Sequence, residues 1–547
     1  MLDNSIAARG VAEWIRAFTI EMVERPLPAR QPLADASLWR IIAQTGFPLR
    51  MRLEEELSRC RAGSGVAVCL PGDLTTSNLR LLLLGARLAL GQQPPKRFVI
   101  IQQRDCAASF ARSFHLEAPD LSASVITLAM REAHLGLVRD EIDRATRYSE
   151  AHYDESGKRF ERVLRPLDLA QAHGASPLNS SDVLLVTGGG TGISAECAIA
   201  LARDTGCKLA LIGLTSPKED AEVRKTLEKL RRMKVTHTYM RADVRNPSSI
   251  RRALGKAIKT MGPVTALIHG AGINRPCLAA TLDESTFLET VYTKVEGARN
   301  VLAAIDTNRL RLFVSFSSVL ACMGMPGQAH YALANEWLSL LTEEFGDAHP
   351  KCRCLAVEWS PWSQAGMVHR MGYEPSLAKA GISAIRPEVG TGMLQSLLSA
   401  NLPKVRVVVM GRQGENPTLR FENEAPADMH FLRRVQLYYP GVELVAEAEL
   451  EMQDDEARPG SAPDRPVSLL RSIAAGAMRE AAGLVMGRNS PPMLKRVFVY
   501  HPLIASGEAP VTLQIAALAT EPNKIEVVVR SSETGFQKEH VRSLWSY

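Results

Sequence analysis

The sequence predicts an α/β protein made of two consecutive strand-and-helix units, followed by a smaller α+β region. In the first unit, apolar strand patterns at residues 65–70 and 97–102 enclose a stretch with helical spacing. A second, longer series of strands and helices runs over residues 183–411, and beyond residue 428 strand patterns flank one Ala-rich helical stretch at residues 467–486. Strands that alternate with helices indicate parallel sheets, whereas the third pattern indicates a mixed fold.

The size and composition of the chain are those of a soluble globular protein with several domains. Its 547 residues exceed what one hydrophobic core supports, and hydrophobic and charged residues make up 46% and 23% of them. The formal net charge of +6 is spread along the sequence, which argues against a nucleic-acid-binding surface. The most apolar run, residues 79–90, contains Arg80 and Arg87 and is too short to span a bilayer. We therefore expect a cytoplasmic protein that binds neither nucleic acid nor membrane.

The cysteines do not predict a metal site. The nine cysteines are scattered, and only Cys352 and Cys354 lie close together in the sequence. No CxxC motif is paired with a second one or with closely spaced histidines, as structural zinc sites require. We expect reduced thiols and no bound metal.

The first unit is predicted to have a nucleotide-binding type of fold without a nucleotide site. Neither of its two apolar strand patterns is followed by a glycine-rich turn, so no backbone there can cradle a pyrophosphate. The polar stretch at residues 171–182 is typical of a linker to the second unit.

A glycine-rich turn opens the second unit and is the candidate cofactor site. Residues 183–194 form an apolar strand pattern that runs into this turn and then into a helix. A turn without side chains lets phosphate oxygens approach the backbone, and the helix N-terminus adds unpaired N–H groups, although a glycine cluster alone can also be only a tight turn. The candidate cofactor-binding residues are Thr187, Gly188, Gly189, Gly190, Thr191, Gly192 and Ile193, with Ser194 where the motif TGxxxGxG has its last glycine.

The ends of the next three strands supply further cofactor-binding candidates. No acidic residue ends the second strand, at residues 208–217, to hold a ribose 2′-hydroxyl, which argues against NAD. The side chains of Thr215, Ser216 and Lys218 could instead hold the 2′-phosphate of NADPH. The remaining candidates are Leu214 in the same loop, Asp243 and Val244 after the third strand, and His269, Gly270, Ala271 and Gly272 at the end of the fourth. Asp243 could equally be a turn or helix-capping residue.

Four polar residues form the candidate catalytic set. In residues 311–337 a strand pattern ends at Ser318, and after a loop Tyr331 opens a helix on which Asn335 lies one turn further along. Reduction of a ketone requires a proton for its oxygen, and a tyrosine with a pKa near ~10 donates it well only if a nearby positive charge lowers that pKa. Lys294 is the candidate for this charge. Ser318 would bind the carbonyl oxygen, and Asn335 would hold a lysine–water proton relay.

The order of these four residues resembles the ketoreductase domains of polyketide synthases. In the wider short-chain dehydrogenase/reductase superfamily a lysine follows the tyrosine by four residues, whereas here Asn335 has that position and Lys294 lies far upstream, as in the synthase domains. The segments at residues 324–338 and 357–367 are also similar to that family. The resemblance covers most of residues 181–400 and implies an NADPH-dependent ketoreductase.

The resemblance also implies a domain arrangement. These ketoreductases have a structural subdomain with a degenerate Rossmann-like fold before the catalytic Rossmann subdomain, and residues 110–128 look like the end of the former. We therefore expect residues 1–178 to be the structural subdomain and residues 179–412 the catalytic subdomain that binds NADPH.

Some family features are missing from this sequence. Many NADPH ketoreductases have an arginine where this chain has Leu214, which leaves open how the 2′-phosphate is held. Residues 273–276 and Met323 match neither of the two motifs that indicate the stereochemistry of the hydroxyl product. Residues 186–198 and 269–276 look closer to iterative enediyne-type or polyunsaturated-fatty-acid-type synthases than to modular ones.

Residues 428–547 are predicted to form a hotdog-like domain that resembles part of a synthase dehydratase. Such a dehydratase needs a histidine as base within an HxxxGxxxxP segment. The corresponding residues 454–468 contain no histidine, and His430, His501 and His540 do not match the motif. We expect a single, inactive and structural hotdog, with a different small domain as the alternative.

The implied activity is the NADPH-dependent reduction of a β-ketoacyl thioester on an acyl carrier protein to a β-hydroxyacyl thioester, in polyketide or related fatty acid biosynthesis. The implied partners are that carrier with its phosphopantetheine arm, ketosynthase and acyltransferase domains, and a second copy of the chain, because hotdog domains often pair. Two alternatives stay open. One is an inactive scaffold module, suggested by Leu214 and Ser194, and the other is a free-standing reductase of small ketones.

Overall fold

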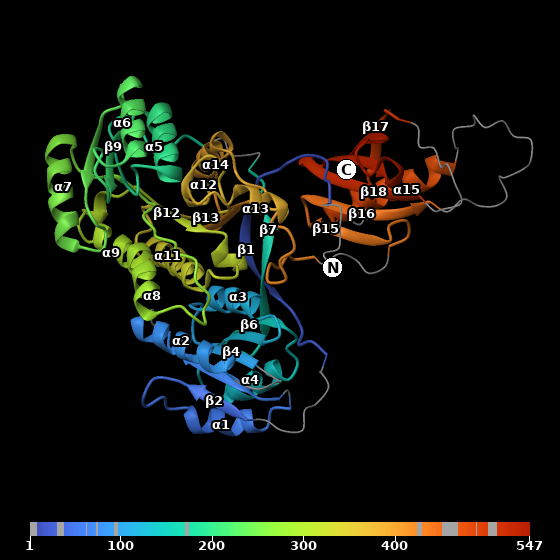
Figure 1. Ribbon diagram of the computed structural model, residues 1–547, viewed down its shortest axis with the longest axis horizontal. Coiled ribbons are helices and arrows are strands. Elements are labelled where there is room, and N and C mark those ends of the chain that lie inside the picture. Colours follow the sequence, from blue (N-terminus) through green and yellow to red (C-terminus); the bar gives the residue numbers. More distant parts are fainter. Residues whose placement is uncertain are drawn as a thin grey trace, which may run out of the picture. The chain divides into compact units, whose positions relative to one another are not determined.

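The computed structural model describes residues 8–29, 38–61, 63–72, 75–91, 97–169, 174–423, 429–450, 469–487, 490–501 and 511–547. These residues form two compact units, each with its own sheet (Figure 1). The larger unit holds residues 15–163 and 174–420. The smaller unit holds residues 8–14, 164–169 and the described residues from 421 onward.

The second half of the larger unit is built on a parallel sheet with the strand order β10-β9-β8-β11-β12-β13-β14. The order reverses between β8 and β11, so the carboxyl ends of these two strands flank the crevice where such sheets bind ligands. The strands are β8 (Val183–Thr187), β9 (Lys208–Gly213), β10 (His237–Arg241), β11 (Ala266–His269), β12 (Leu312–Ser318), β13 (Arg353–Trp359) and β14 (Arg406–Met410).

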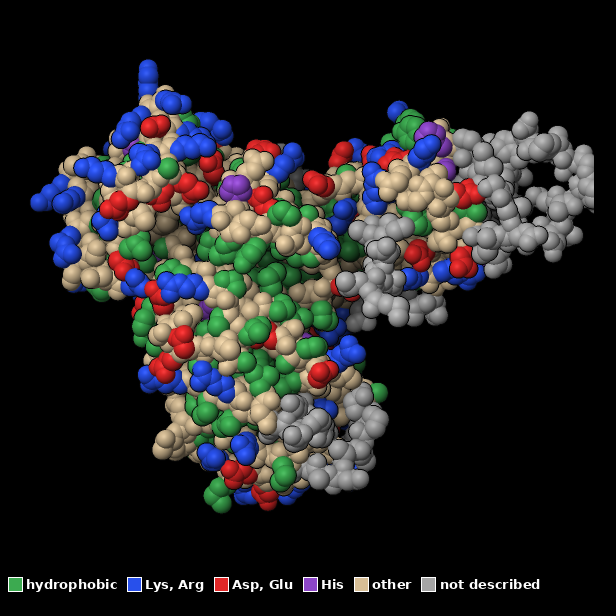
Figure 2. Space-filling view, in the orientation of Figure 1, with side chains coloured by type: hydrophobic (Ala, Val, Ile, Leu, Met, Phe, Trp, Pro, Cys, Tyr) green, Lys and Arg blue, Asp and Glu red, His purple; other side chains and the backbone are tan. Residues whose placement is uncertain are grey.

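Helices cover this part of the sheet and complete the Rossmann-like α/β architecture that the sequence predicts (Figure 1). They are α5 (Gly192–Thr205), α6 (Ala221–Arg232), α7 (Pro247–Met261), α8 (Glu284–Val291), α9 (Gly297–Leu302), α11 (Ala329–Ala348) and α14 (Pro387–Ser399). Charged residues are frequent on α6, and on the face in Figure 2 basic side chains lie among acidic ones there.

The first half of the larger unit repeats the parallel arrangement. Strands β2 (Trp39–Ile42), β3 (Gly65–Leu70), β4 (Arg97–Gln102), β5 (Ser122–Thr127) and β6 (Tyr148–Tyr153) run parallel, and β7 (Arg159–Pro166) pairs antiparallel with β6. The two strands expected at residues 65–70 and 97–102, with the helix α2 (Thr76–Leu90) between them, are confirmed.

The two halves are not separate folds, because one strand joins their sheets. Strand β1 (Arg16–Glu24) lies between β7 and β14 and pairs antiparallel with β14, which gives one continuous 14-stranded sheet. Residues 8–14, which we expected in the first subdomain, belong to the smaller unit instead. There the Trp14 indole donates to Glu443 Oε2 at 2.8 Å and packs edge-on against Tyr439 at 5.0 Å.

Buried contacts lock the two halves of the larger unit together. The ring of Phe110, on α3 (Ala108–Glu117), stacks on Phe287 of α8 with ring centroids 6.0 Å apart. Arg112 of the same helix is 2% exposed, donates to the Ala321 carbonyl at 2.6 Å and forms an ion pair with Glu150 at 2.6 Å. The first half therefore supports the loop that follows β12.

The smaller unit is a six-stranded antiparallel sheet with one long helix packed on it. The strand order is β15-β16-β18-β19-β20-β17, and helix α15 (Leu469–Met486) contacts β16, β18 and β19. The strands are β15 (Arg434–Tyr439), β16 (Glu443–Leu450), β17 (Met493–Val499), β18 (Val511–Glu521), β19 (Lys524–Ser531) and β20 (Val541–Ser546). The separate antiparallel sheet and the long helix agree with the expected elements.

Residues 454–468, where we looked for a dehydratase histidine, lie outside the described residues. No helix among the described residues is long and apolar enough to cross a membrane.

We predict that Arg112→Met destabilises the larger unit by about 3–5 kcal/mol, because it leaves the Glu150 carboxylate buried without its partner. The matched control is Arg80→Met, which removes an exposed ion pair to Glu284 that also crosses between the two halves. Its expected effect is within about 1 kcal/mol. Denaturant unfolding measures both, and equal losses of stability in the two variants would contradict the structural role of Arg112.

Candidate active site

The glycine turn after β8 lies at the carboxyl edge of the sheet, against the end of β11. Gly188 has φ +65° and Gly192 has φ +63°, in the left-handed region that favours glycine. A Cβ atom added at Gly188 would lie 3.0 Å from the Gly270 carbonyl oxygen. The turn therefore needs glycine, and helix α5 begins directly after it with its N–H groups at the crevice.

Ser194 fits at the place of the motif's last glycine because its neighbour across the turn has no side chain. A Cβ atom added at Gly270 would lie only 2.0 Å from Ser194 Oγ and 3.2 Å from its Cβ. The Ser194 side chain is 5% exposed and occupies the space beside Gly270. Serine in place of the motif's last glycine therefore narrows the space beside Gly270 but does not block the crevice.

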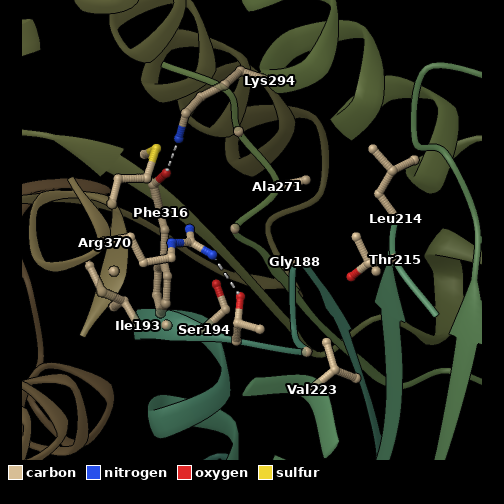
Figure 3. Close-up of a pocket in the computed structure, with 18 of the residues that line it drawn as sticks. Gly188, Ile193, Ser194, Leu214, Thr215, Val223, Ala271, Lys294, Phe316 and Arg370 are labelled. Carbon is tan, nitrogen blue, oxygen red and sulfur yellow. Dashed lines mark hydrogen bonds between the residues drawn. The ribbon is translucent and has the colours of Figure 1, made fainter. Parts of the chain in front are cut away.

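A cavity of about 270 Å³ follows the turn along the ends of β8, β9 and β11 (Figure 3). Most of the expected cofactor-binding residues line it: Gly188, Gly190, Thr191, Gly192, Ile193, Leu214, Thr215, Gly270, Ala271 and Gly272. The sequence analysis did not propose the lining residues Gly213, Asp220, Val223, Tyr239, Phe316, Trp359, Gly366, Met367 and Arg370.

Six expected cofactor residues are not among those that line this cavity. They are Thr187, Gly189, Ser216, Asp243, Val244 and His269. The carboxylate of Asp243 is paired with Arg245 at 2.8 Å and accepts from the Arg245 N–H, which agrees with the alternative of a turn residue. The Ser216 carbonyl accepts from Asp220 N in the turn before α6.

His269 connects the end of β11 to the residues on both sides. Its Nδ1 lies 2.9 Å from Thr187 Oγ1 and its Nε2 lies 3.0 Å from the Lys294 carbonyl oxygen. Burial, and then the nearby Lys294 charge, lower the pKa of His269 to about 3, so the ring is neutral. This histidine therefore fixes the backbone at Lys294 and is not placed to bind a ligand.

Lys294 is buried at one end of the cavity. It lies in a π-helical turn (Tyr292–Glu296) between α8 and α9 and is 3% exposed. Its ammonium donates to the Phe316 carbonyl oxygen at 2.7 Å, and burial lowers its pKa to about 7. A Cβ atom at Gly272 would lie 2.9 Å from Lys294 Cε, so this glycine leaves the path of the lysine side chain open.

Tyr331 faces Lys294 from the first turn of α11. The Lys294 nitrogen lies 5.8 Å from the centre of the Tyr331 ring. Burial raises the pKa of Tyr331 to about 12, against a smaller lowering by Asn335. This direction is opposite to the lowering by Lys294 that we expected, because burial disfavours the charged tyrosinate. The Lys294 ammonium itself is bonded to the Phe316 carbonyl.

Asn335 lies one turn beyond Tyr331, and its amide is only partly satisfied. Its Nδ2 donates to the Tyr331 carbonyl oxygen at 2.7 Å, and its backbone carbonyl accepts from Ser317 Oγ at 3.0 Å. The buried Oδ1 atom has no hydrogen-bond partner among the described residues. A water molecule or ligand group is the partner that such an atom requires.

A second cavity, of about 140 Å³, meets the first at Tyr331. Ser317, Trp359, Ile193 and Met367 also line both cavities, and Ser318 lines the second. Its remaining walls are largely apolar, from the loop after β12 and from the segment after β13. Tyr331 thus lies where a group bound in the second cavity would meet one bound in the first, and Ser318 lines the second cavity alone.

The segment after β13 packs directly on the glycine turn. It contains the short helix α12 (Gly366–Arg370), and a Cβ atom at Gly192 would lie 3.2 Å from Gly366 Cα. Gly366 itself has φ +83°. Two glycines in contact therefore let this segment cover the cavity closely.

The fold and this arrangement of turn, lysine and tyrosine define a Rossmann-like α/β domain with a candidate dinucleotide site at the carboxyl edge of its sheet. More narrowly, residues 183–364 match the sequence family described as the KR domain.

The curated relatives are large synthases. The polyketide synthase PksN of Bacillus subtilis is 25% identical over 261 residues, which are 46% of this chain and 5% of that protein. A phthioceranic/hydroxyphthioceranic acid synthase of Mycobacterium tuberculosis is 27% identical over 223 residues, which are 40% of this chain and 10% of that protein. The chain thus matches only a small part of the length of these relatives.

Solved ketoreductase structures share the fold. An N-terminal ketoreductase from the macrolactin assembly line matches with a TM-score of 0.58 and 17% identity, and covers 74% of this chain and 92% of that one. The first ketoreductase of the tylosin polyketide synthase matches with a TM-score of 0.60 and 22% identity, over 72% of this chain and 92% of that one. The first-half and second-half sheets are therefore arranged as in polyketide synthase ketoreductases.

We predict that Gly270→Ala destabilises the protein by roughly 1–3 kcal/mol through overpacking against Ser194. Ser194→Gly alone should be tolerated, and the double variant Gly270→Ala/Ser194→Gly should recover most of the loss, because the glycine frees the space that the added methyl group needs. Thermal unfolding of the three variants measures this. A double variant that is as unstable as Gly270→Ala would contradict the assigned contact.

Proposed function

We propose that this chain reduces a β-ketoacyl thioester, carried on an acyl carrier protein, to a β-hydroxyacyl thioester with NADPH. The observation that carries the proposal is the position of Tyr331 at the junction of two cavities. One cavity has the glycine turn and Lys294, and the other has apolar walls and Ser318. A hydride donor in the first and a carbonyl group in the second would meet beside the tyrosine hydroxyl.

The first cavity fits a nicotinamide dinucleotide. The glycine turn leaves the space that a Cβ atom at Gly188 would fill, and the N-terminus of α5 offers N–H groups to a pyrophosphate. At the other end of the phosphate site, Leu214 and Thr215 follow β9, and no carboxylate ends the strand itself to hold a ribose 2′-hydroxyl, which favours NADPH. The Asp220 carboxylate further along this loop also lines the cavity, but it caps α6 and accepts from Thr215 Oγ1. When bound, the cofactor supplies hydride to the carbonyl carbon.

Tyr331 would donate its proton to the ketone oxygen as that oxygen gains negative charge. Ser318 would donate a hydrogen bond to the same oxygen and hold it in place. The buried Lys294 ammonium would stabilise the tyrosinate that forms, and the unpartnered Asn335 Oδ1 would hold a water molecule that returns a proton. Burial of Tyr331, Lys294 and Asn335 strengthens their electrostatic interactions.

The carrier-bound substrate and the partner domains belong to the same proposal. The relatives are named as synthases, and the chain corresponds to a small part of each. We infer that it acts in the cytoplasm with an acyl carrier protein and with ketosynthase and acyltransferase domains, in an enediyne-type or polyunsaturated-fatty-acid-type pathway. A second copy of the chain would pair through the smaller unit.

The smaller unit would be an inactive, dehydratase-like hotdog domain. Its antiparallel sheet with one long helix supports this assignment. His540 there is buried, and its Nε2 lies 2.8 Å from Ser531 Oγ, as in a structural hydrogen bond between strands. The unit would thus support the ketoreductase and add no dehydration step.

The competing function is an inactive scaffold module. It is favoured by the raised pKa of Tyr331 and by the bond from Lys294 to the Phe316 carbonyl. Incubation with NADPH and a β-ketoacyl-cysteamine thioester separates the two functions. Oxidation of NADPH with formation of the hydroxy thioester supports the enzyme, and absence of both supports the scaffold.

We predict that Tyr331→Phe lowers kcat by at least about 100-fold, because the variant retains the ring but has no proton to donate. Substrate and NADPH binding should change little. The control is Tyr292→Phe, which removes a hydroxyl from a half-exposed tyrosine in the turn that contains Lys294. Initial rates of NADPH oxidation measure both, and a Tyr331→Phe variant with near wild-type kcat would remove this tyrosine from the mechanism.

We predict that kcat falls as the pH rises through about 7, within about one unit. The lowered pKa of Lys294 means that its ammonium loses its proton in this range, while Tyr331, with its raised pKa, stays protonated. Lys294→Arg keeps the charge at all these pH values, so its residual activity should lack this decline. A flat wild-type profile between pH 6 and pH 9 would contradict the assignment.

A further inference from the structure

Arg370 is the last residue of α12, in the segment that covers the cofactor cavity. Its Nη1 donates to the Thr191 hydroxyl at 3.1 Å, and this bond brings the guanidinium over the glycine turn (Figure 3). Thr191 is the residue directly before Gly192, where α5 begins. Arg370 therefore lies beside the N–H groups that would face a phosphate.

The positive charges that line this cavity are few. Among the described lining residues, only Lys294 and Arg370 are cationic. Lys294 lies at the Tyr331 end, and its ammonium is bonded to the Phe316 carbonyl. A dinucleotide brings at least two negative charges to the turn, and NADPH adds a further phosphate. Arg370 is the side chain in place to balance them.

The known contacts of Arg370 leave most of its donors available. Within the described chain, its hydrogen bond to Thr191 and its contact with Glu222 at 3.8 Å both involve Nη1. The side chain is 46% exposed, which is compatible with a group that a ligand covers. A guanidinium has five N–H donors in a planar fork, and this geometry suits two phosphate oxygens.

We propose that Arg370 binds phosphate oxygens of the nicotinamide dinucleotide, and that the covering segment thereby supplies the basic residue that is missing at Leu214. The inference rests on the proposed cofactor chemistry. The contact between Gly366 and Gly192 fixes the start of α12 against the turn, so Arg370 reaches the phosphate site only while the segment covers the cavity. Binding of the dinucleotide then favours the state in which the segment covers the first cavity. The second cavity is also complete in this state, because Met367 of the same segment lines both cavities.

Two phosphate groups could be the ligand, the pyrophosphate or the 2′-phosphate, and binding measurements distinguish them. We expect Arg370→Gln to raise the Kd for NADPH by about tenfold or more, as for the loss of a charge-assisted hydrogen bond. If the pyrophosphate is bound, the Kd values for NADH and ADP-ribose rise by a similar factor. If the 2′-phosphate is bound, only the Kd for NADPH rises. Isothermal titration calorimetry with the full chain gives all three constants.

The matched control is Arg251→Gln, which removes an exposed positive charge from α7, away from the lining residues of the cavity. It should leave all three Kd values unchanged, and the melting temperatures of both variants should stay near that of the wild type. An unchanged NADPH Kd in folded Arg370→Gln, or an equal rise in Arg251→Gln, would overturn the inference alone. Wild-type protein that binds neither NADPH nor NADH would overturn the proposed function and this inference with it.

Discussion

The site depends on the buried polar contacts that hold helix α11 against the first half of the larger unit. Glu336 follows Asn335 on this helix, is fully buried, and accepts from the Ser109 hydroxyl at 2.7 Å and the Ser109 N–H at 3.2 Å. Arg162 of β7 lies 3.8 Å from the same carboxylate. One face of the helix is thus tied to the first half while the other presents Tyr331 to the cavities. Burial raises the pKa of Glu336, and its Oε1 has no hydrogen-bond partner among the described residues, so the two bonds from Ser109 are the contacts that hold this carboxyl group in place.

This constraint explains why a half without a nucleotide site accompanies the half that has one. Strand β1 continues the sheet from β14 to β7, and α3 packs on α11. Arg112 on α3 reaches the Ala321 carbonyl, three residues after Ser318. The segment that connects Ser318, at the end of β12, to Tyr331, in the first turn of α11, is therefore held at both ends by the first half. A short loop between two fixed ends keeps its groups in place without a ligand.

The local patterns of the sequence predicted the parts of the site that lie within one element. The glycine turn, the strand ends and the helix that starts near Tyr331 follow from periodicity and spacing, and the structure places them around one cavity. Contacts between residues far apart in the sequence could not be predicted from these local patterns. The pairing of the Asp243 carboxylate with Arg245, two residues along the chain, is by contrast local and agrees with the alternative of a turn residue. Arg370 reaches the turn through the approach of Gly366 to Gly192, 174 residues apart in sequence. The insertion of β1 between the two halves likewise has no local signal.

The proposed reaction is tested most directly by measuring which carbon of the product receives the hydride of NADPH. Wild-type protein is incubated with NADPH that carries deuterium at the transferable C4 position and with a β-ketoacyl-cysteamine thioester, and the product is analysed by mass spectrometry. The account predicts a hydroxy thioester with one deuterium, located on the β-carbon. A hydroxy product without deuterium, or deuterium at another carbon, would contradict hydride transfer beside Tyr331.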